Sequence, residues 1–182
     1  MILQLPVSLG EALDKLSILD IKLQNIKDDR KNDVQVEYNM LYELLLPYVN
    51  KYNTLYTLMK DINSKLWNLL SEQRNPELTI EEYGILSKKV VEENDARFRT
   101  KDKINILAQS VIKEKKGYDL STKNIVISSN SYDDIITEII RESVYYDKLN
   151  VSFDESLQES VVSKIKEYFS YDVSIIVNLI SG

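Results

Sequence analysis

The sequence contains no histidine and no cysteine among its 182 residues. This double absence excludes zinc sites of the Cys/His type, haem ligation through His and iron–sulfur clusters. It also excludes His-based catalytic triads, thiol nucleophiles and disulfide bonds. Carboxylates remain as candidate bases or metal ligands, because Asp and Glu serve in both roles without His.

Long apolar runs and a surplus of basic residues are also lacking. No apolar run approaches the roughly 18 residues that a membrane span requires, and the N-terminus lacks the charged-then-apolar layout of a signal peptide. Residues 1–118 hold 18 Lys and Arg against 18 Asp and Glu, whereas residues 119–182 hold 5 against 11, which is the whole net charge of −6. An acidic C-terminal part does not favour binding to phosphates. We therefore expect a cytoplasmic protein that neither spans a membrane nor binds nucleic acid.

Helical periodicity dominates residues 1–118. Ser8 and Glu11 have the spacing of a capping box, and an apolar stripe follows them to residue 26, which predicts a first helix. A second stripe at 4-3-4-3 spacing runs without a break over residues 34–69, so we expect a five-heptad coiled-coil seam there. Pro47 lies inside this seam and should kink the helix or split it in two.

A third helix is expected over residues 80–115. Thr79 and Glu82 form a second capping box before it, and Gly117 provides a stop signal after it. The Asn-Pro turn that precedes this helix would fold it back onto residues 34–69. The sequence therefore predicts a long antiparallel, coiled-coil-like hairpin.

Polar residues interrupt the apolar pattern at the middle of this hairpin. The residues that would meet there are two tyrosines of the second helix and four polar or charged residues of the third: Tyr52, Tyr56, Asn94, Asp95, Arg97 and Lys101. One interpretation is a solvated, charged helix face held by pairs between neighbouring turns. The other is a partly buried network of Asp95, Arg97 and Lys101 with tyrosine hydroxyls, which could fix the helix register or bind an anionic ligand.

Several ordered motifs over residues 5–118 carry a family resemblance. They are Pro-Val-Ser-x-Gly-Glu-x-x-Asp-Lys-Leu-x-Ile-Leu-x-Ile-Lys from Pro6 to Lys22, then Leu66-Trp67, Glu93-Asn94-Asp95-x-Arg97, Lys101, Ile104-Asn105 and Glu114-Lys115-Lys116-x-Tyr118. The series resembles an uncharacterised, mostly bacterial family of small helical domains that are encoded near, or fused to, glycosyltransferases and tetratricopeptide-repeat proteins. The resemblance implies an association with glycan synthesis, and it implies no established activity and no agreed catalytic residues.

Three residues within these motifs each have two interpretations. Lys15 and Lys22 lie seven residues apart on one helical face. They could jointly meet acidic or phenolic groups of the third helix, or they could be surface lysines whose stems lie along the protein. Trp67 is expected as a core anchor beside the turn rather than as a platform for stacking a sugar. The four residues after it are Asn-Leu-Leu-Ser, where the family tends to carry charged residues.

From residue 119 the periodicity changes to alternating strands and helices. Short apolar runs predict three strands, at residues 125–128, 149–153 and 173–177. Ser131 should cap the first helix between them, and Asp154 or Ser156 should start the second. We therefore expect an α+β chain with a helical domain over residues 1–118 and a small βαβαβ unit, with a three-stranded parallel sheet, over residues 119–182. So thin a sheet should continue against more chain, a partner or the long hairpin.

The first strand-to-helix turn of this unit is the place where a nucleotide would bind. Its hydroxyls could hold a phosphate at a helix N-terminus, but it contains no glycine, and Asp133 and Asp134 would repel an anion. Ordinary helix capping is therefore the expected role of this turn.

Two functions of different classes stay open. The long seam, the Tyr-rich surface and the missing catalytic groups favour a non-catalytic interaction or scaffold module that docks a glycosyltransferase or another copy of itself. The alternative is a transferase-type enzyme, or an accessory domain, that binds a nucleotide sugar, although no Asp-x-Asp pair is present. The sequence predicts no cofactor and no metal site and identifies no catalytic residue, and an anionic or sugar ligand is still open.

Overall fold

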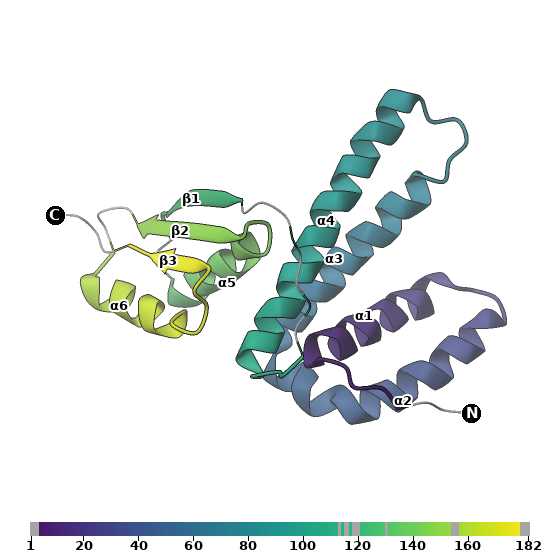
Figure 1. The fold of residues 1–182 in the computed structure, drawn as a ribbon, viewed down its shortest axis with the longest axis horizontal. Coiled ribbons are helices and arrows are strands. Elements are labelled where there is room, and N and C mark those ends of the chain that lie inside the picture. The colour runs from purple at the N-terminus through teal and green to yellow at the C-terminus, as the bar shows by residue number, and fades with distance from the viewer. Residues whose placement is uncertain are drawn as a thin grey trace. The chain divides into compact units, whose positions relative to one another are not determined.

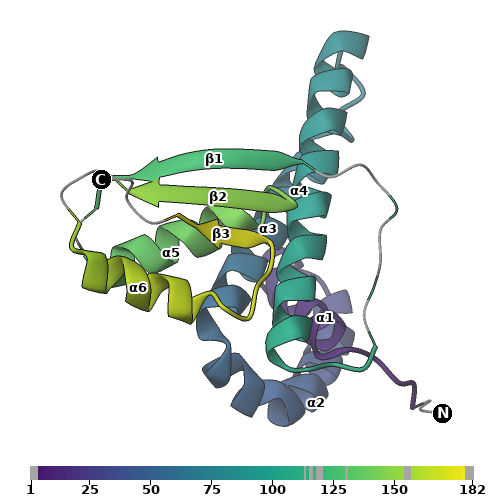
Figure 2. The same ribbon diagram turned by 60° about the vertical axis from the view of Figure 1, so that its left-hand side comes forward.

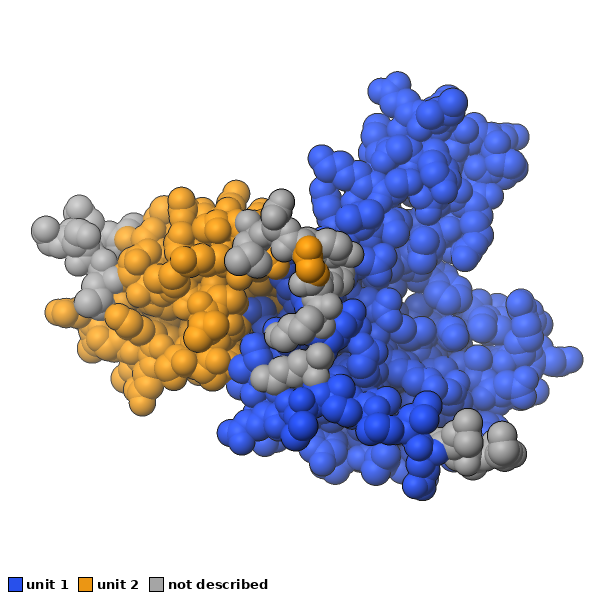
Figure 3. Space-filling model, in the orientation of Figure 1, with its two compact units in different colours: residues 1–114 blue, residues 115–182 orange. Residues whose placement is uncertain are grey.

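The computed structural model describes residues 4–112, 114, 117, 121–129, 131–153 and 157–178. Its contacts divide the chain into two compact units, residues 1–114 and 115–182, which Figure 3 shows in separate colours. The predicted α+β class is confirmed, because the described residues form four helices followed by a three-stranded parallel sheet and its two helices. The boundary predicted between residues 118 and 119 lies outside the described residues.

Helices account for the regular structure described in the first unit. They are α1 (Leu9–Asn25), α2 (Arg30–Lys51), α3 (Asn53–Glu72) and α4 (Ile80–Leu107) (Figure 1). The first begins where predicted, because the Ser8 hydroxyl accepts a hydrogen bond from the backbone N–H of Glu11 at 3.2 Å. Before α4, Thr79 and Glu82 form the complete predicted capping box. None of the helices among the described residues combines the length and the apolarity that crossing a bilayer requires.

The predicted seam over residues 34–69 is divided between α2 and α3. The expected split does occur, but five residues after Pro47: α2 continues to Lys51, and Tyr52, with φ −112° and ψ 33°, separates the two helices. Pro47 and Glu43 are both exposed. Water can therefore satisfy the Glu43 carbonyl that the missing N–H of Pro47 leaves free, so α2 does not end at the proline.

The antiparallel hairpin consists of α3 and α4, and α1 packs against α2, α3 and α4 (Figure 1). The residues before Tyr52 were expected to line the helix predicted over residues 80–115, which is α4. This expectation is wrong, since α2 packs mainly against α1. An apolar stripe specifies that a helix is covered but not which helix covers it. The fully buried side chains of this unit come from α1, α3 and α4 and include Leu13, Leu16, Met59, Ile62 and Ile104.

Helix α4, which was predicted over residues 80–115, ends at Leu107, eight residues before the predicted end. Ala108 is its C-cap, and Gln109 follows with φ 52°, in the left-handed region that glycine usually occupies. The backbone N–H of Ser110 donates to the Asn105 carbonyl at 2.9 Å, and that of Gln109 donates to the Ile106 carbonyl at 3.1 Å. These two bonds make a Schellman motif, so α4 ends here although no glycine marks the position.

The second unit is a parallel sheet in the order β1-β2-β3. Its elements are β1 (Thr122–Ile127), α5 (Tyr132–Ser143), β2 (Lys148–Phe153), α6 (Glu159–Tyr168) and β3 (Ile175–Val177). Ser131 caps α5 as predicted, with its hydroxyl accepting from the Asp134 N–H at 3.4 Å. Asp154 and Ser156, the predicted start of α6, lie outside the described residues.

Both helices of the second unit cover the same face of its sheet (Figure 2). Two right-handed crossovers that step in the same direction across a sheet place their helices on one side. The side chains of Leu149, Val151 and Phe153 are buried on that face, whereas Val126 and Ile176 are exposed. The sheet therefore has one covered and one uncovered face within this unit.

Candidate functional site

A buried ion pair links α1 to α4 in the first unit. The carboxylate of Asp14 is 2% exposed. It accepts two hydrogen bonds from Arg97, Nε to Oδ1 at 2.8 Å and Nη2 to Oδ2 at 2.6 Å, and a third from Asn63 Nδ2 at 2.8 Å. The hydrogen bonds that Arg97 donates to Asp14 raise the pKa of the Arg97 guanidinium above its ordinary value. Three helices thus meet at one carboxylate, because Asn63 lies on α3.

Lys101 makes a second ion-paired centre one helical turn after Arg97. Its ammonium group contacts the Glu11 carboxylate of α1, and it lies 2.7 Å from Oε2 of Glu114, beyond the end of α4. Burial would lower the pKa of Lys101, but the hydrogen bonds and negative charges of the two carboxylates outweigh it and raise the pKa. We call Glu11, Asp14, Asn63, Arg97, Lys101 and Glu114 the ionic cluster.

The backbone of α1 approaches α4 closely beside the cluster. The N–H of Gly10 donates to Oδ1 of Asn105 at 2.8 Å in a buried hydrogen bond. A Cβ atom at Gly10 would lie 2.5 Å from the backbone carbonyl oxygen of Lys101, so only glycine fits here without a shift of the backbone. This contact places Glu11, the next residue, against the ammonium group of Lys101.

The Glu11 side chain corrects part of the prediction for the first helix. It was expected to close a capping box with Ser8. The Ser8 hydroxyl does accept the Glu11 N–H, but the carboxylate contacts Lys101. A charge-assisted bond to an ammonium group is stronger than a bond to a neutral backbone N–H, so the long-range partner takes the carboxylate.

Of the predicted site residues, Arg97 and Lys101 come together in the ionic cluster. Asp95 is half-buried on α4 and faces away from Arg97, because residues two apart on a helix do not share a face. Asn94 is exposed on the same helix. The carboxylate beside Arg97 is therefore that of Asp14, from another helix.

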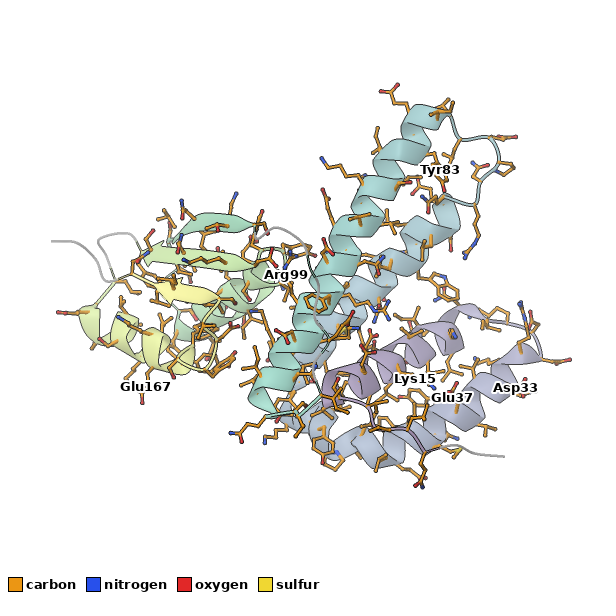
Figure 4. All side chains as sticks on the ribbon, in the orientation of Figure 1. Lys15, Asp33, Glu37, Tyr83, Arg99 and Glu167 are labelled. Atoms are coloured by element: carbon orange, nitrogen blue, oxygen red, sulfur yellow. The ribbon has the colours of Figure 1, made fainter. Side chains whose placement is uncertain are left out.

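The other predicted residues lie elsewhere in the first unit. Lys15 forms a 2.6 Å ion pair with Glu37 of α2, both side chains being largely exposed, and the two lie together between α1 and α2 in Figure 4. Lys15 thus contacts an acidic group of α2, and not one of α4, the helix predicted over residues 80–115. Lys22 is half-buried in the last turn of α1. Tyr52 and Tyr56 are buried where α2 joins α3, and burial together with the negative charge of Asp20 raises the pKa of Tyr56.

Sequence reasoning missed Glu11, Asp14, Asn63 and Glu114 as site residues. A signal for Asp14 was present, since Gly10, Asp14 and Ser17 share one face of the predicted first helix, next to the apolar stripe. A carboxylate there is buried when the helix packs, and a buried carboxylate needs a cation. No sequence spacing names that cation, because Arg97 is 83 residues away.

The ionic cluster is suited to holding helices together. Both of its cations are already neutralised by carboxylates, so an anionic ligand would have to displace Glu11, Asp14 or Glu114. Among the residues that the structure describes, no group of three or more Asp and Glu side chains is arranged to hold a metal ion. The geometry of the cluster therefore supports a structural role.

The far end of the α3–α4 hairpin carries a second feature, an exposed group of apolar side chains. This end projects beyond α1 and α2, and Tyr83 is labelled near it (Figures 1 and 4). Ile80 is 94% exposed. We call the exposed apolar residues of this end the hairpin tip: Leu70, Ile80, Tyr83 and Ile85. Trp67, which was expected as a core anchor, is half-buried in the same half of α3.

The tip is held by polar contacts between the two helices. Nε2 of Gln73 donates to the Ser87 hydroxyl at 2.7 Å, and Nζ of Lys65 lies 3.4 Å from Oε1 of Glu93. The apolar tip residues are therefore presented on a braced pair of helices. Large exposed apolar side chains on one part of a protein commonly mark a binding surface for protein.

The chain matches no family model, no curated protein and no solved structure. The resemblance to helical domains associated with glycosyltransferases stays a prediction from the sequence motifs.

Proposed function

We propose that the chain is a non-catalytic interaction module whose hairpin tip docks a protein partner. The observation that carries the proposal is the high exposure of four apolar side chains, Leu70, Ile80, Tyr83 and Ile85, at one end of a braced helical pair. The ionic cluster supports it indirectly, because its cations are engaged by the protein's own carboxylates. The first unit then consists of a structural base and a binding end.

We infer that the α3–α4 pair is a coiled coil. Leu55, Met59, Ile62 and Leu66 follow the heptad spacing of 4-3-4, and each of them is buried. Residues at this spacing form the seam of a supercoiled helix pair, and the seam gives α3 and α4 a fixed register. A fixed register would keep the apolar residues of both helices together at the tip.

The partner that we propose is a glycosyltransferase acting inside the cell. This part of the proposal rests on the motifs from Pro6 to Tyr118, which resemble domains encoded near or fused to such enzymes. A stiff, apolar helical end matches a groove of complementary shape on a partner protein. The module would hold the enzyme in place in glycan synthesis and would carry out no chemistry itself.

The test measures binding of the purified chain to glycosyltransferases of its own organism, by isothermal titration calorimetry. Ile80→Asp should weaken binding at least tenfold, because it places a charge at the most exposed apolar residue of the tip. Val173→Asp is the matched control, since Val173 is a comparably exposed apolar residue of the second unit. Equal affinity of the wild type and both variants would disprove docking by the tip.

A ligand screen separates this proposal from the transferase alternative. A ligand that binds only the folded state raises the apparent melting temperature. We expect no shift for the wild-type chain against a panel of nucleotide sugars with and without Mg²⁺ or Mn²⁺. A concentration-dependent rise with one of them would favour the nucleotide-sugar function over a purely docking role.

A further inference from the structure

Helix α2 carries apolar side chains on two sides, one covered and one exposed. Its inner side carries Val34, Tyr38, Leu41 and Leu45 and packs against α1, with Leu45 buried. Its outer side carries four apolar residues at intervals of four, Val36, Met40, Leu44 and Tyr48, which are 62%, 55%, 68% and 43% exposed. A helix with one covered side normally presents polar residues on the other. The outer side of α2 thus has the composition of a contact surface.

The charges at the two ends of this outer side are opposite. Asp33 lies in the first turn of α2 and Lys51 in the last, and both are exposed. They are eighteen residues apart, which is five turns of an α-helix at about 3.6 residues per turn, so they lie on one line along the helix. Met40 and Leu44 lie between them on the same side. Figure 4 labels Asp33 near the start of α2.

We propose that this outer side of α2 pairs with the same side of α2 in a second copy of the chain, in antiparallel orientation. The two-fold axis crosses α2 at the height of residue 42. Each residue of one copy then lies opposite a residue of the second copy, and the two residue numbers add up to 84. Asp33 then faces Lys51 of the second copy at both ends of the contact. Met40 faces Leu44, and Val36 faces Tyr48. A two-fold contact of this kind uses one surface twice and closes on itself.

The charge order selects a second copy and fixes its direction. A parallel pairing would set Asp33 against Asp33 and Lys51 against Lys51, and like charges across a contact disfavour it. The antiparallel pairing turns both repulsions into attractions without any further residue. The Lys15–Glu37 pair would lie at the rim of the contact, where it stays hydrated.

The expected affinity is modest. The 22 residues of α2 span about 33 Å, and one helix side from each copy buries less than the roughly 800 Å² per partner of a standard interface. We therefore expect a dimer that forms in the micromolar range and dissociates on dilution. The surface is separate from the hairpin tip, so this inference does not depend on the proposed function.

The first experiment is sedimentation velocity of the full chain from micromolar to submillimolar concentration. The wild type should shift from monomer to dimer, and Leu44→Asp should weaken the dimer at least a hundredfold because a charge would be buried without a partner. Val173→Asp, in the second unit, is the matched control and should dimerise like the wild type, because Val173 is 92% exposed and lies outside α2 and the hairpin tip. A wild type that stays monomeric throughout, or a Leu44→Asp variant that dimerises equally well, overturns the proposal.

The second experiment uses two charge reversals, Asp33→Lys and Lys51→Asp. Each variant alone sets like charges at both ends of its own dimer and should dimerise about tenfold more weakly than the wild type. An equimolar mixture of the two variants pairs opposite charges at both ends and should regain the wild-type affinity as a heterodimer. Circular dichroism of each variant checks that α2 stays folded. A mixture that associates no better than its components refutes the antiparallel register.

Discussion

Replacing Arg97 with Met removes the cation of the buried ion pair and keeps most of the aliphatic volume. Both hydrogen bonds to Asp14, at 2.6 and 2.8 Å, are lost, and that carboxylate is left 2% exposed without a counter-ion. Breaking a buried pair from one side costs about 3–5 kcal/mol. Because Asn63 still donates to Oδ1 of Asp14, we expect the lower end, about 3 kcal/mol in the free energy of unfolding. Domains of this kind have a total of roughly 5–15 kcal/mol, so the loss should be large.

Urea unfolding followed by tryptophan fluorescence measures this loss in the first unit alone, since Trp67 is the single tryptophan of the sequence. Lys15→Met is the control, because it removes the largely exposed pair with Glu37, for which we expect at most about 1 kcal/mol. The double variant Asp14→Leu/Arg97→Met removes both charges together and should be more stable than Arg97→Met. Similar small losses for Arg97→Met and Lys15→Met would refute the structural role of the ionic cluster.

Three further predictions concern the backbone and pH. Gln109→Gly should stabilise the first unit by about 1 kcal/mol, because Gln109 has φ 52°; an unchanged urea midpoint would contradict the Schellman end of α4. Gly10→Ala should destabilise the first unit by roughly 1–3 kcal/mol, because the added Cβ would lie 2.5 Å from the Lys101 carbonyl oxygen. Gly84→Ala, on the exposed side of α4 with open space around it, should stabilise the same unit by about 0.5–1 kcal/mol. Urea midpoints that move in the same direction for both variants would contradict this pair of predictions. Burial raises the pKa of Tyr56, so above about pH 10 the unfolded chain loses this proton while the folded chain keeps it, and stability should fall as pH rises. Tyr56→Phe should lose less stability than the wild type between pH 9 and pH 11 in the same urea assay, and parallel pH profiles would contradict the shift.

The features predictable from sequence were those that a few neighbouring residues determine. The caps at Ser8, Thr79 and Ser131 each need only a hydroxyl and a backbone N–H within one turn, and all three form. The order of strands and helices in the second unit follows from local changes in apolar periodicity. The end of α4 could not be found in this way, because Gln109 adopts a conformation that the sequence pattern assigns to glycine.

The features that escaped prediction depend on which distant residues meet. Arg97 and Lys101 were singled out because charged residues interrupted an apolar stripe, and that reasoning placed them inside a helix pair. Asp14 and Glu11, their partners from another helix, come from α1, since α1 rather than α2 fills the space beside the lower half of α4. A heptad stripe indicates which side of a helix is buried against other helices, but not which helices those are. The choice between two apolar helices depends on shape and on buried charges, and one sequence does not display it.

The distance between the ionic cluster and the hairpin tip bears on how separable folding and binding should be. Ile80 and Arg97 are seventeen residues apart on α4, which corresponds to about 25 Å along the helix. Substitutions farther apart than about 10 Å that share no partner have additive effects on stability. Combining Ile80→Asp with Arg97→Met should therefore give the sum of the two single changes in unfolding free energy, whereas partner binding should respond to Ile80→Asp alone while the chain stays folded. Strong non-additivity would mean that the tip and the cluster are coupled through α4. A partner bound at the tip would then change the stability of the ionic cluster.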